Sequence, residues 1–123
     1  MEETIIVEFE THLFGIKGNQ KGVLKIPKEY YTLTNERLKV SKQGMMTSTK
    51  TDIDLYKIKD INVIQKFKDK AMNLGDIEII SSDSSHPKLM LKKIKDPHTV
   101  REQIRTASRE SRKEEGVSYR QDV

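Results

Sequence analysis

The stretch Tyr-Tyr-Thr-Leu-Thr-Asn-Glu-Arg-Leu-Lys-Val, residues 30–40, decides the fold that this sequence predicts. Its two halves contain the aromatic, β-branched and apolar residues that suit a half-buried strand, and a polar Thr-Asn-Glu corner separates them. Asn35 can adopt left-handed backbone angles and bond nearby amides, so the chain can reverse there. Leu33 and Leu38 would then anchor a β-hairpin in the core, with Tyr31 as a further structural position.

Arg37 is the most distinctive charged residue of this hairpin. If Leu38 and Val40 point inward, Arg37 lies on the opposite face of its strand. We expect its guanidinium to pair with a carboxylate of the sheet, Asp54 or Glu78, in preference to a ligand. The hairpin therefore indicates a fold and carries no chemistry of its own.

The rest of the chain up to residue 94 also has the pattern of strands. Including the hairpin, about seven segments combine strand-forming residues with partial alternation; they are residues 4–9, 30–34, 37–42, 47–55, 60–63 (within 56–64), 76–80 and 88–94. Residues 66–74 fit one or two helical turns or an irregular crossover, with Phe67, Ala71 and Leu74 as the apolar positions and Gly75 as the end. The pattern predicts a mainly β fold.

One helix is expected at the C-terminal end. Asp96 followed by Pro97 is typical of a helix start, an N-cap acid before proline at the first helical position. The residues that recur at helical spacing after it are Val100, Ile104, Ala107 and Ser111. Because this stripe ends while helix formers continue, we expect the first turns to pack and the remainder to protrude. The predicted helix covers residues 97–115, Gly116 ends it, and residues 116–123 form a flexible tail.

Composition restricts the possible classes of protein. The chain has 123 residues, of which 34% are apolar and 34% are charged, which suits a single domain over residues 1–115. With no cysteine, disulfides, thiolate metal sites and a cysteine nucleophile are excluded. The N-terminus is acidic where a signal peptide would be basic, and its apolar run is too short to span a bilayer. We therefore expect a soluble, cytoplasmic protein.

No residue pattern in the chain indicates catalysis or a cofactor. The three histidines, His12, His86 and His98, are far apart in sequence and form no ligand-spaced pair. Asp52 and Asp54 would share the wet face of a strand, which is an ordinary arrangement. Nucleotide-binding glycine motifs, nucleophile elbows and calcium-binding loops are missing from the sequence. We therefore expect no enzyme activity, no metal site and no cofactor.

Basic residues leave three binding alternatives open. The net charge is +4 with both signs interspersed, which is typical of a mixed soluble surface. Lys17, Lys21 and Lys25 surround a glycine-rich turn that could meet anionic lipid head groups or phosphate. Two further groups would form a positive face if they were adjacent. In residues 57–70 lysines alternate with apolar or acidic residues, and in residues 88–95 they cluster without a nearby acid. Nucleic-acid binding there is disfavoured because few aromatic residues are left for stacking.

Three segments give the chain a resemblance to the bacterial pleckstrin-homology domain family. Residues 31–38 look like the tyrosine-threonine-leucine-threonine hairpin of that family with its following arginine. Residues 58–63 are similar to its next strand, and residues 74–79, which contain Gly75, to its glycine-aspartate strand start. The resemblance implies two nearly orthogonal antiparallel sheets in a barrel of about seven strands, capped by a C-terminal helix.

This chain departs from the family pattern before the hairpin. Relatives often carry a transmembrane hairpin there, whereas residues 13–29 of this chain are polar and rich in glycine and lysine. The resemblance therefore implies a soluble version of the domain. It does not import phosphoinositide binding, because Lys17, Lys21 and Lys25 match the basic eukaryotic signature only loosely.

The leading functional hypothesis is a non-enzymatic interaction module that binds a protein partner or a second copy of itself. The protruding helix offers the surface, and Arg105, Arg109, Arg112 and Lys113 are its candidate contacts. Acidic residues on the same helix offset these charges, as on an ordinary solvated face. Binding of anionic lipid or phosphate through the lysine-rich turn is the first alternative, and weak nucleic-acid binding is the second.

Overall fold

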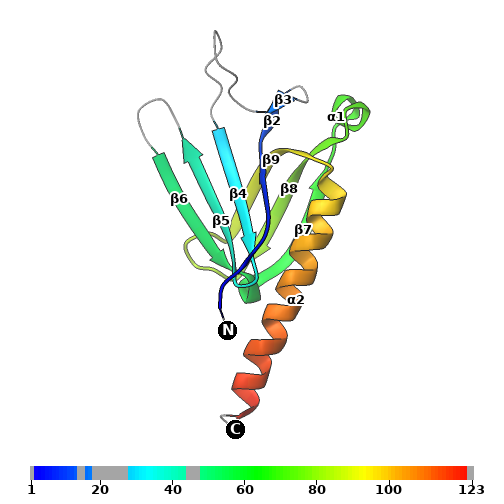
Figure 1. Cartoon of the computed structure of the whole chain (residues 1–123). Coiled ribbons are helices and arrows are strands. Elements are labelled where there is room, and N and C mark those ends of the chain that lie inside the picture. The colour runs from blue at the N-terminus through cyan, green and yellow to red at the C-terminus, as the bar shows by residue number, and fades with distance from the viewer. Residues whose placement is uncertain (1, 14–15, 18–27, 44–47, 122–123) are drawn as a thin grey trace.

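A computed structural model of the chain describes residues 2–13, 16–17, 28–43 and 48–121. Its larger sheet has four antiparallel strands in the order β1-β4-β5-β6. Their bounds are Ile5–Glu10 for β1, Lys28–Thr34 for β4, Arg37–Gln43 for β5 and Ser48–Asp54 for β6 (Figure 1). In this order β1 and β6 are the outer strands.

The second sheet has three antiparallel strands in the order β7-β8-β9. They run Ile58–Ile64, Leu74–Ser81 and Lys88–Lys95, and the 3₁₀ turn η1, Leu55–Lys57, leads into β7 from the first sheet. The five-residue helix α1, Phe67–Ala71, joins β7 to β8. A small pair, β2 (His12–Leu13) and β3 (Ile16–Lys17), completes the described strands.

The two sheets face each other without joining into a continuous barrel. Across the strands that the structure describes, the sheets are linked by a single isolated bridge, between Thr11 and Ile94. The Tyr31 hydroxyl adds a polar link beside it, because the backbone N–H of Lys92 donates to it over 3.2 Å. The mainly β fold of two antiparallel sheets with one C-terminal helix is confirmed, and the described strands do not close into a barrel.

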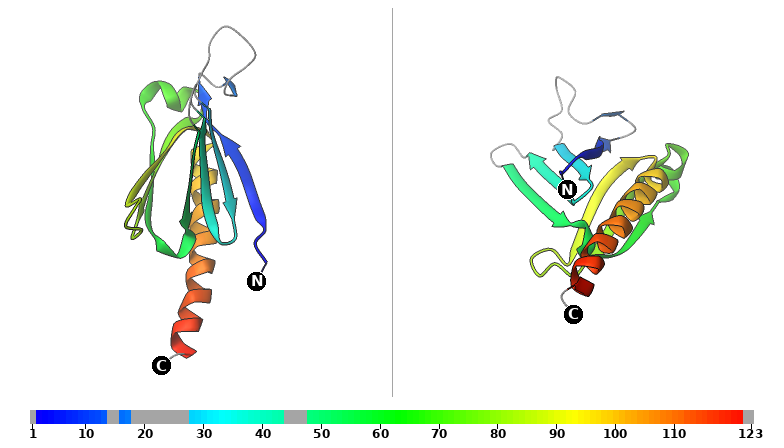
Figure 2. Two further views of the ribbon diagram at one scale, coloured as in Figure 1. Left: turned by 90° about the vertical axis from the view of Figure 1, so that its left-hand side faces the viewer. Right: turned by 60° about the horizontal axis from the view of Figure 1, so that its bottom comes forward.

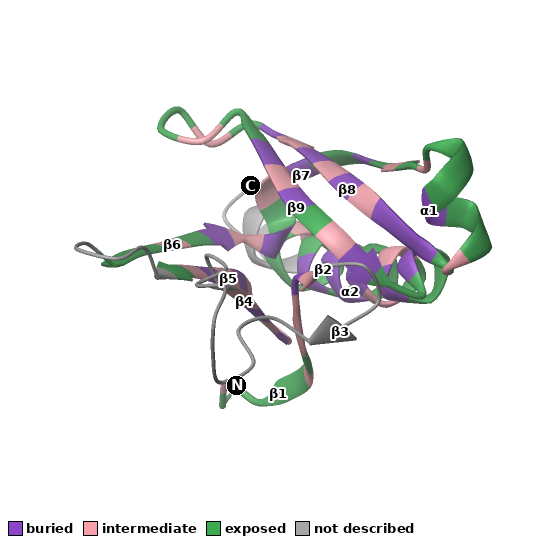
Figure 3. Cartoon of the chain, turned by 90° about the horizontal axis from the view of Figure 1, so that it is seen from above, coloured by how far each residue is buried: buried purple, intermediate pink, exposed green. Residues whose placement is uncertain are grey.

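Buried side chains of both sheets meet in one core, and the stripes of buried residues lie on the facing surfaces (Figure 3). This core gains most of its stability from apolar area removed from water. The side chains that are almost completely inaccessible are Tyr31, Leu33, Leu38, Ile53, Leu55, Ile58, Leu74, Ile77, Ile79, Leu91, Ile94 and Ile104. The predicted inward positions Leu33 and Leu38 are thereby confirmed.

The predicted hairpin is present, but its corner forms differently from the expectation. Leu33 lies opposite Leu38 in the β4–β5 register. The hydroxyl of Thr34 accepts from the backbone N–H groups of Glu36 and Arg37, at 3.1 and 2.8 Å. Asn35 is not among the described residues with positive φ; its side-chain oxygen instead accepts from the N–H of Thr4 over 2.7 Å. The Thr34 side chain therefore makes the turn, and Asn35 holds the N-terminal segment.

Helix α2 runs from Pro97 to Gln121. It lies between β1 and β7, which are one outer strand of each sheet, and its C-terminal end extends beyond both sheets (Figure 2). Its buried positions include Val100, Ile104 and Ala107, as predicted. Asp96 precedes it with φ of 54° instead of the extended angles of a usual N-cap, and its carbonyl accepts from the Val100 N–H.

The end of α2 was predicted incorrectly. The helix continues past Glu115 and through Gly116, where a stop was expected, so residues 116–121 are helical rather than a flexible tail. A glycine inside a helix costs only about 1 kcal/mol relative to alanine. Strong helix formers on its N-terminal side can offset that cost.

Gly75 also has a different role from the one predicted. It does not end α1; it is the second residue of β8 and is buried. A Cβ at this position would lie 2.8 Å from Cγ of Gln65 and 3.0 Å from Cγ of Pro97. Glycine is therefore needed here for the close approach of β8 to the start of α2.

Candidate functional site

Helix α2 borders a polar groove on the side that faces β7. The groove has a volume of about 280 Å³ and is lined by Ile58, Lys59, Asp60 and Ile61 of β7 and by Arg101, Arg105, Ser108, Arg109 and Arg112 of α2. We call it the arginine groove. It brings together three of the four helix residues that the sequence suggested as an interaction surface.

Helical geometry explains why these arginines share a side. Residues three or four apart lie on one face of a helix, and Arg101, Arg105, Arg109 and Arg112 follow that spacing. Ile104 and Ala107 are buried against the sheets, which fixes the rotation of the helix. The arginines therefore flank the packed stripe next to β7.

The arginines differ in the hydrogen bonds and ion pairs that they form with the rest of the protein. Nε of Arg101 donates to the carbonyl of Ile61 over 2.9 Å, and Nη1 of Arg101 pairs with Glu102. Arg105 approaches Glu102 only at 3.9 Å. Within the described ranges, Arg109, Arg112 and Lys59 make no ion pair. The groove therefore presents cationic groups that are free to meet an acidic partner.

The edge of β7 in this groove is closed to an added strand. The N–H of Ile61 donates to Oδ1 of Asp60 over 3.0 Å, and the carbonyl of Ile61 accepts from Arg101. A strand edge binds another strand through such outward backbone groups. Because side chains already occupy them here, a ligand in the arginine groove would be recognised by side chains.

A second and larger groove lies on the other side of α2, next to β1. Its volume is about 750 Å³, and its lining is formed by Ile6 of β1, Asn35, and His98, Thr99, Glu102, Gln103, Thr106, Ala107 and Glu110 of α2. We call it the apolar groove. Ile6 is 46% exposed there, so α2 separates a cationic groove from a mainly apolar one.

A family model for the bacterial PH domain matches residues 22–108, more than half of the chain. The chain belongs to the bacterial PH domain family. This agrees with the two antiparallel sheets and the C-terminal helix, and domains of this type are in general binding modules. No curated protein matches the chain. The match ends at Ser108, so Arg109 and Arg112 of the arginine groove lie beyond the family-defining part.

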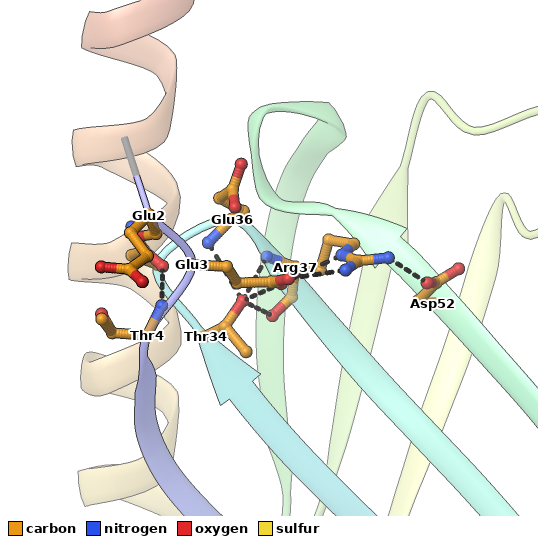
Figure 4. Close-up of polar contacts among 8 residues, drawn as sticks. Glu2, Glu3, Thr4, Thr34, Glu36, Arg37 and Asp52 are labelled. Carbon is orange, nitrogen blue, oxygen red and sulfur yellow. Dashed lines mark hydrogen bonds and ion pairs between the residues drawn. The ribbon is translucent and has the colours of Figure 1, made fainter.

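Arg37 is a structural residue of this bacterial PH domain that pairs with a carboxylate of the sheet, as expected, although that carboxylate is Asp52 and a second partner, Glu3, was not predicted. Its guanidinium holds Glu3 through two bonds, Nη2 to Oε1 at 2.6 Å and Nε to Oε2 at 3.0 Å. Nη1 donates to Asp52 over 2.9 Å (Figure 4). These bonds, with a further one from the Thr34 hydroxyl, lower the pKa of Glu3 to about 2. Neither Asp54 nor Glu78 makes an ion pair with Arg37 among the residues described.

The lysines of β9 do not form the free positive face that one alternative required. Lys88 pairs with Glu78 at 3.1 Å, Lys93 with Asp69 at 3.0 Å and Lys92 with Asp76 at 3.9 Å. The Lys88 ammonium and the Asn62 amide lower the pKa of Glu78. The expectation that residues 88–95 lack a nearby acid is therefore wrong, because the acids come from β8 and α1.

The remaining sequence candidates fall outside these grooves or outside the described residues. Lys21 and Lys25 lie outside the described residues, and only the backbone of Lys17 is described, in β3. Lys113 is exposed and approaches Glu110 at 3.5 Å instead of lining the arginine groove. In the part of the chain with described side chains, no three His, Asp or Glu residues are grouped to hold a metal ion.

Three features were not found from the sequence: the apolar groove, the Glu3 contact with Arg37, and the exposure of Phe67. All three depend on contacts between distant parts of the chain.

No helix among the described residues combines the length and apolar character needed to cross a membrane.

Proposed function

We propose that this bacterial PH domain is a non-enzymatic interaction module that binds an acidic segment of a protein partner in the arginine groove. The observation that supports this most is the row of arginines along α2. Its last two members, Arg109 and Arg112, form no ion pair with any described residue. Arginine suits this role because its planar fork binds carboxylates in a bidentate manner.

The size of the groove favours a short extended peptide. Arg101 and Arg112 are separated by eleven helical steps, or about 16 Å at 1.5 Å per residue. That distance corresponds to about five residues of extended chain at 3.3 Å each. A segment with acidic residues on alternate positions could place one carboxylate near Arg109 and another near Arg112.

The charge pattern favours a peptide over a nucleic acid. Asp60 contributes a carboxylate to the groove, and further acids lie on α2 outside it, Glu102 and Glu110 on the side of the apolar groove and Glu114 and Glu115 after Arg112. A continuous phosphate backbone places a negative charge at every step, including opposite Asp60, whereas a peptide can place its acids only opposite the arginines. No aromatic side chain lines the groove, so bases would also lack a stacking surface.

The test uses the full-length chain and a fluorescein-labelled peptide of eight residues rich in Glu and Asp, with the Gln/Asn version as its control. We expect saturable anisotropy changes with the acidic peptide that weaken as salt is added. The double variant Arg109→Glu and Arg112→Glu should lower affinity by at least about tenfold, since like charges then face each other.

A matched control makes the same change of charge elsewhere. Lys68 and Lys70 are exposed on α1 and line neither groove. The Lys68→Glu and Lys70→Glu double variant should keep the affinity of the unchanged chain within about twofold. Equal losses in the two double variants would mean that net charge, and not the groove, governs binding, and would overturn the proposal.

A further inference from the structure

Helix α1 carries the most exposed apolar side chain among the described residues. Phe67 is 93% exposed, and Ile64, just before α1 in the chain, is 43% exposed. The helix lies at the end of the second sheet (Figures 1 and 3), and none of its residues lines either groove of α2. A phenyl ring held almost wholly in water is unfavourable by the apolar area it leaves exposed.

Phe67 is exposed because Asp69, on the opposite face of α1, is the residue that packs against the protein. Asp69 is the buried residue of this helix. At 100° per residue, Phe67 and Ala71 lie on the side opposite Asp69, whereas Lys68 and Lys70 flank that side. The sequence indicated Phe67 and Ala71 only as apolar positions of this segment; the buried acid determines their orientation.

Asp69 is fixed by a residue of β9. Nζ of Lys93 lies 3.0 Å from both Oδ1 and Oδ2 of Asp69. Lys93 has φ of 51° near the register shift between β8 and β9, and Asn73, with φ of 54°, follows α1. The carbonyl of Asn73 accepts from the N–H of Asp96 over 2.9 Å. The helix is therefore anchored at its base, with Phe67 held outward.

The lysines around Phe67 have charges that are not neutralised. Lys66, Lys68 and Lys70 are exposed. None of them makes an ion pair in the part of the chain that the structure describes. The single acid of α1, Asp69, is already bound to Lys93. An apolar ring therefore projects from the middle of a cationic surface.

We propose that α1 docks on the surface of an anionic lipid bilayer, with Phe67 inserted at the interface and Lys66, Lys68 and Lys70 against the head groups. Interfacial binding of this kind combines buried apolar area with attraction to anionic lipids. Neither groove of α2 includes a residue of α1. Because Phe67 projects outward and not into a groove that could hold a peptide, α1 is better suited to a deformable surface such as a bilayer. The site shares no residue with the arginine groove.

Vesicle sedimentation of the full-length chain tests this directly. We expect binding to phosphatidylcholine vesicles that contain 30% phosphatidylserine, little binding to pure phosphatidylcholine, and weakening with salt. Phe67→Ala should lower the partition coefficient by about tenfold, and each change of Lys66, Lys68 or Lys70 to Gln by about fivefold. The Arg109→Glu and Arg112→Glu variant, altered only in the arginine groove, should bind within about threefold of the unchanged chain.

The missing tryptophan of this chain permits a positional test. A Phe67→Trp variant should show blue-shifted emission on anionic vesicles and quenching by brominated lipid. The matched Tyr56→Trp variant places its reporter in η1, at the other end of β7, and should remain unquenched. Water-like emission from Trp at position 67 on bound vesicles, or no vesicle binding at low salt, would overturn the proposal. So would binding to labelled DNA that needs the lysines but not Phe67.

Discussion

The Glu3 carboxylate and the Arg37 guanidinium form a two-bonded ion pair that attaches the N-terminal segment to the corner of the β4–β5 hairpin. Thirty-four residues separate the partners in sequence. The hydroxyl of Thr34 also donates to Glu3, over 2.8 Å. One carboxylate therefore connects the start of the chain to the segment that is most characteristic of the fold.

This ion pair makes stability depend on acidity in a defined range. The pKa of Glu3 falls from its usual 4.5 to about 2 in the folded chain. A lowered pKa contributes stability above the unfolded value, and that contribution is lost as pH falls through the folded value. In urea unfolding, Glu3→Gln should be less stable than the unchanged chain at pH 5–7. The difference should shrink progressively between pH 4.5 and 2.

Glu8→Gln is the control for this measurement, because Glu8 is exposed and forms no ion pair with a described residue. Its effect on the free energy of unfolding should be small over the same range. If the Glu3→Gln difference stays constant down to pH 2, the carboxylate charge is not what stabilises the corner.

Gly75 and Gly116 should respond in opposite directions to the same substitution. Gly75→Ala places a Cβ within 3.0 Å of Gln65 and Pro97 and should lower the free energy of unfolding by about 1–3 kcal/mol. Gly116 has no atom within 4 Å of its added Cβ, so Gly116→Ala should stabilise by about 0.5–1 kcal/mol. Denaturant titrations of both variants measure this. Destabilisation by Gly116→Ala would argue against a helix at that position.

Removing the centre of the α2 packing stripe should be costly. Ile104 has no accessible surface, and Ile104→Ala should lower the free energy of unfolding by about 2–5 kcal/mol through lost burial and a cavity. Thr106→Ala on the exposed side of the same helix should change it by less than about 0.5 kcal/mol. Similar effects of the two substitutions would contradict the docking of α2 on the sheets.

Tyr31 tests the polar link between the sheets. Its hydroxyl donates to Glu29 over 2.8 Å and accepts from the Lys92 N–H of the other sheet. Burial is the main reason that the pKa of Tyr31 is raised, so the hydroxyl stays protonated at neutral pH. Tyr31→Phe should cost about 1–2 kcal/mol, because the buried partners lose a bond. Tyr56→Phe, at a partly exposed position, should be close to neutral by the same unfolding assay.

The sequence predicted those features that depend on neighbouring residues. The alternation of apolar and polar residues, together with turn residues, was sufficient to predict the hairpin and the strands around Ile77 and Leu91. Asp96 followed by Pro97 was sufficient to predict the start of α2. The residues of the arginine groove contributed by α2 could also be inferred, because Arg105, Arg109 and Arg112 follow helical spacing. Their position opposite Lys59 and Asp60 could not, since it depends on how α2 packs against β7.

The failures share a physical cause, which is tertiary contact overriding local preference. Arg37 binds an acid of the sheets, Asp52, as expected, but its second partner, Glu3, precedes β1 and lies 34 positions away in sequence, so local pattern could not indicate it. The orientation of α1 was not predicted, because the contact that turns Asp69 inward comes from Lys93 in a distant strand. Gly116 was expected to end α2, yet a single glycine is too weak a helix breaker to do so.

The most direct test of the account is an amide NMR titration of the ¹⁵N-labelled chain with the acidic eight-residue peptide. The account predicts saturable shifts confined to the arginine groove, at Lys59, Asp60, Arg105, Ser108, Arg109 and Arg112, which are absent with the Gln/Asn peptide. Shifts centred on Ile6, Asn35 and Thr106 of the apolar groove, or no saturable shift at low salt, would contradict it.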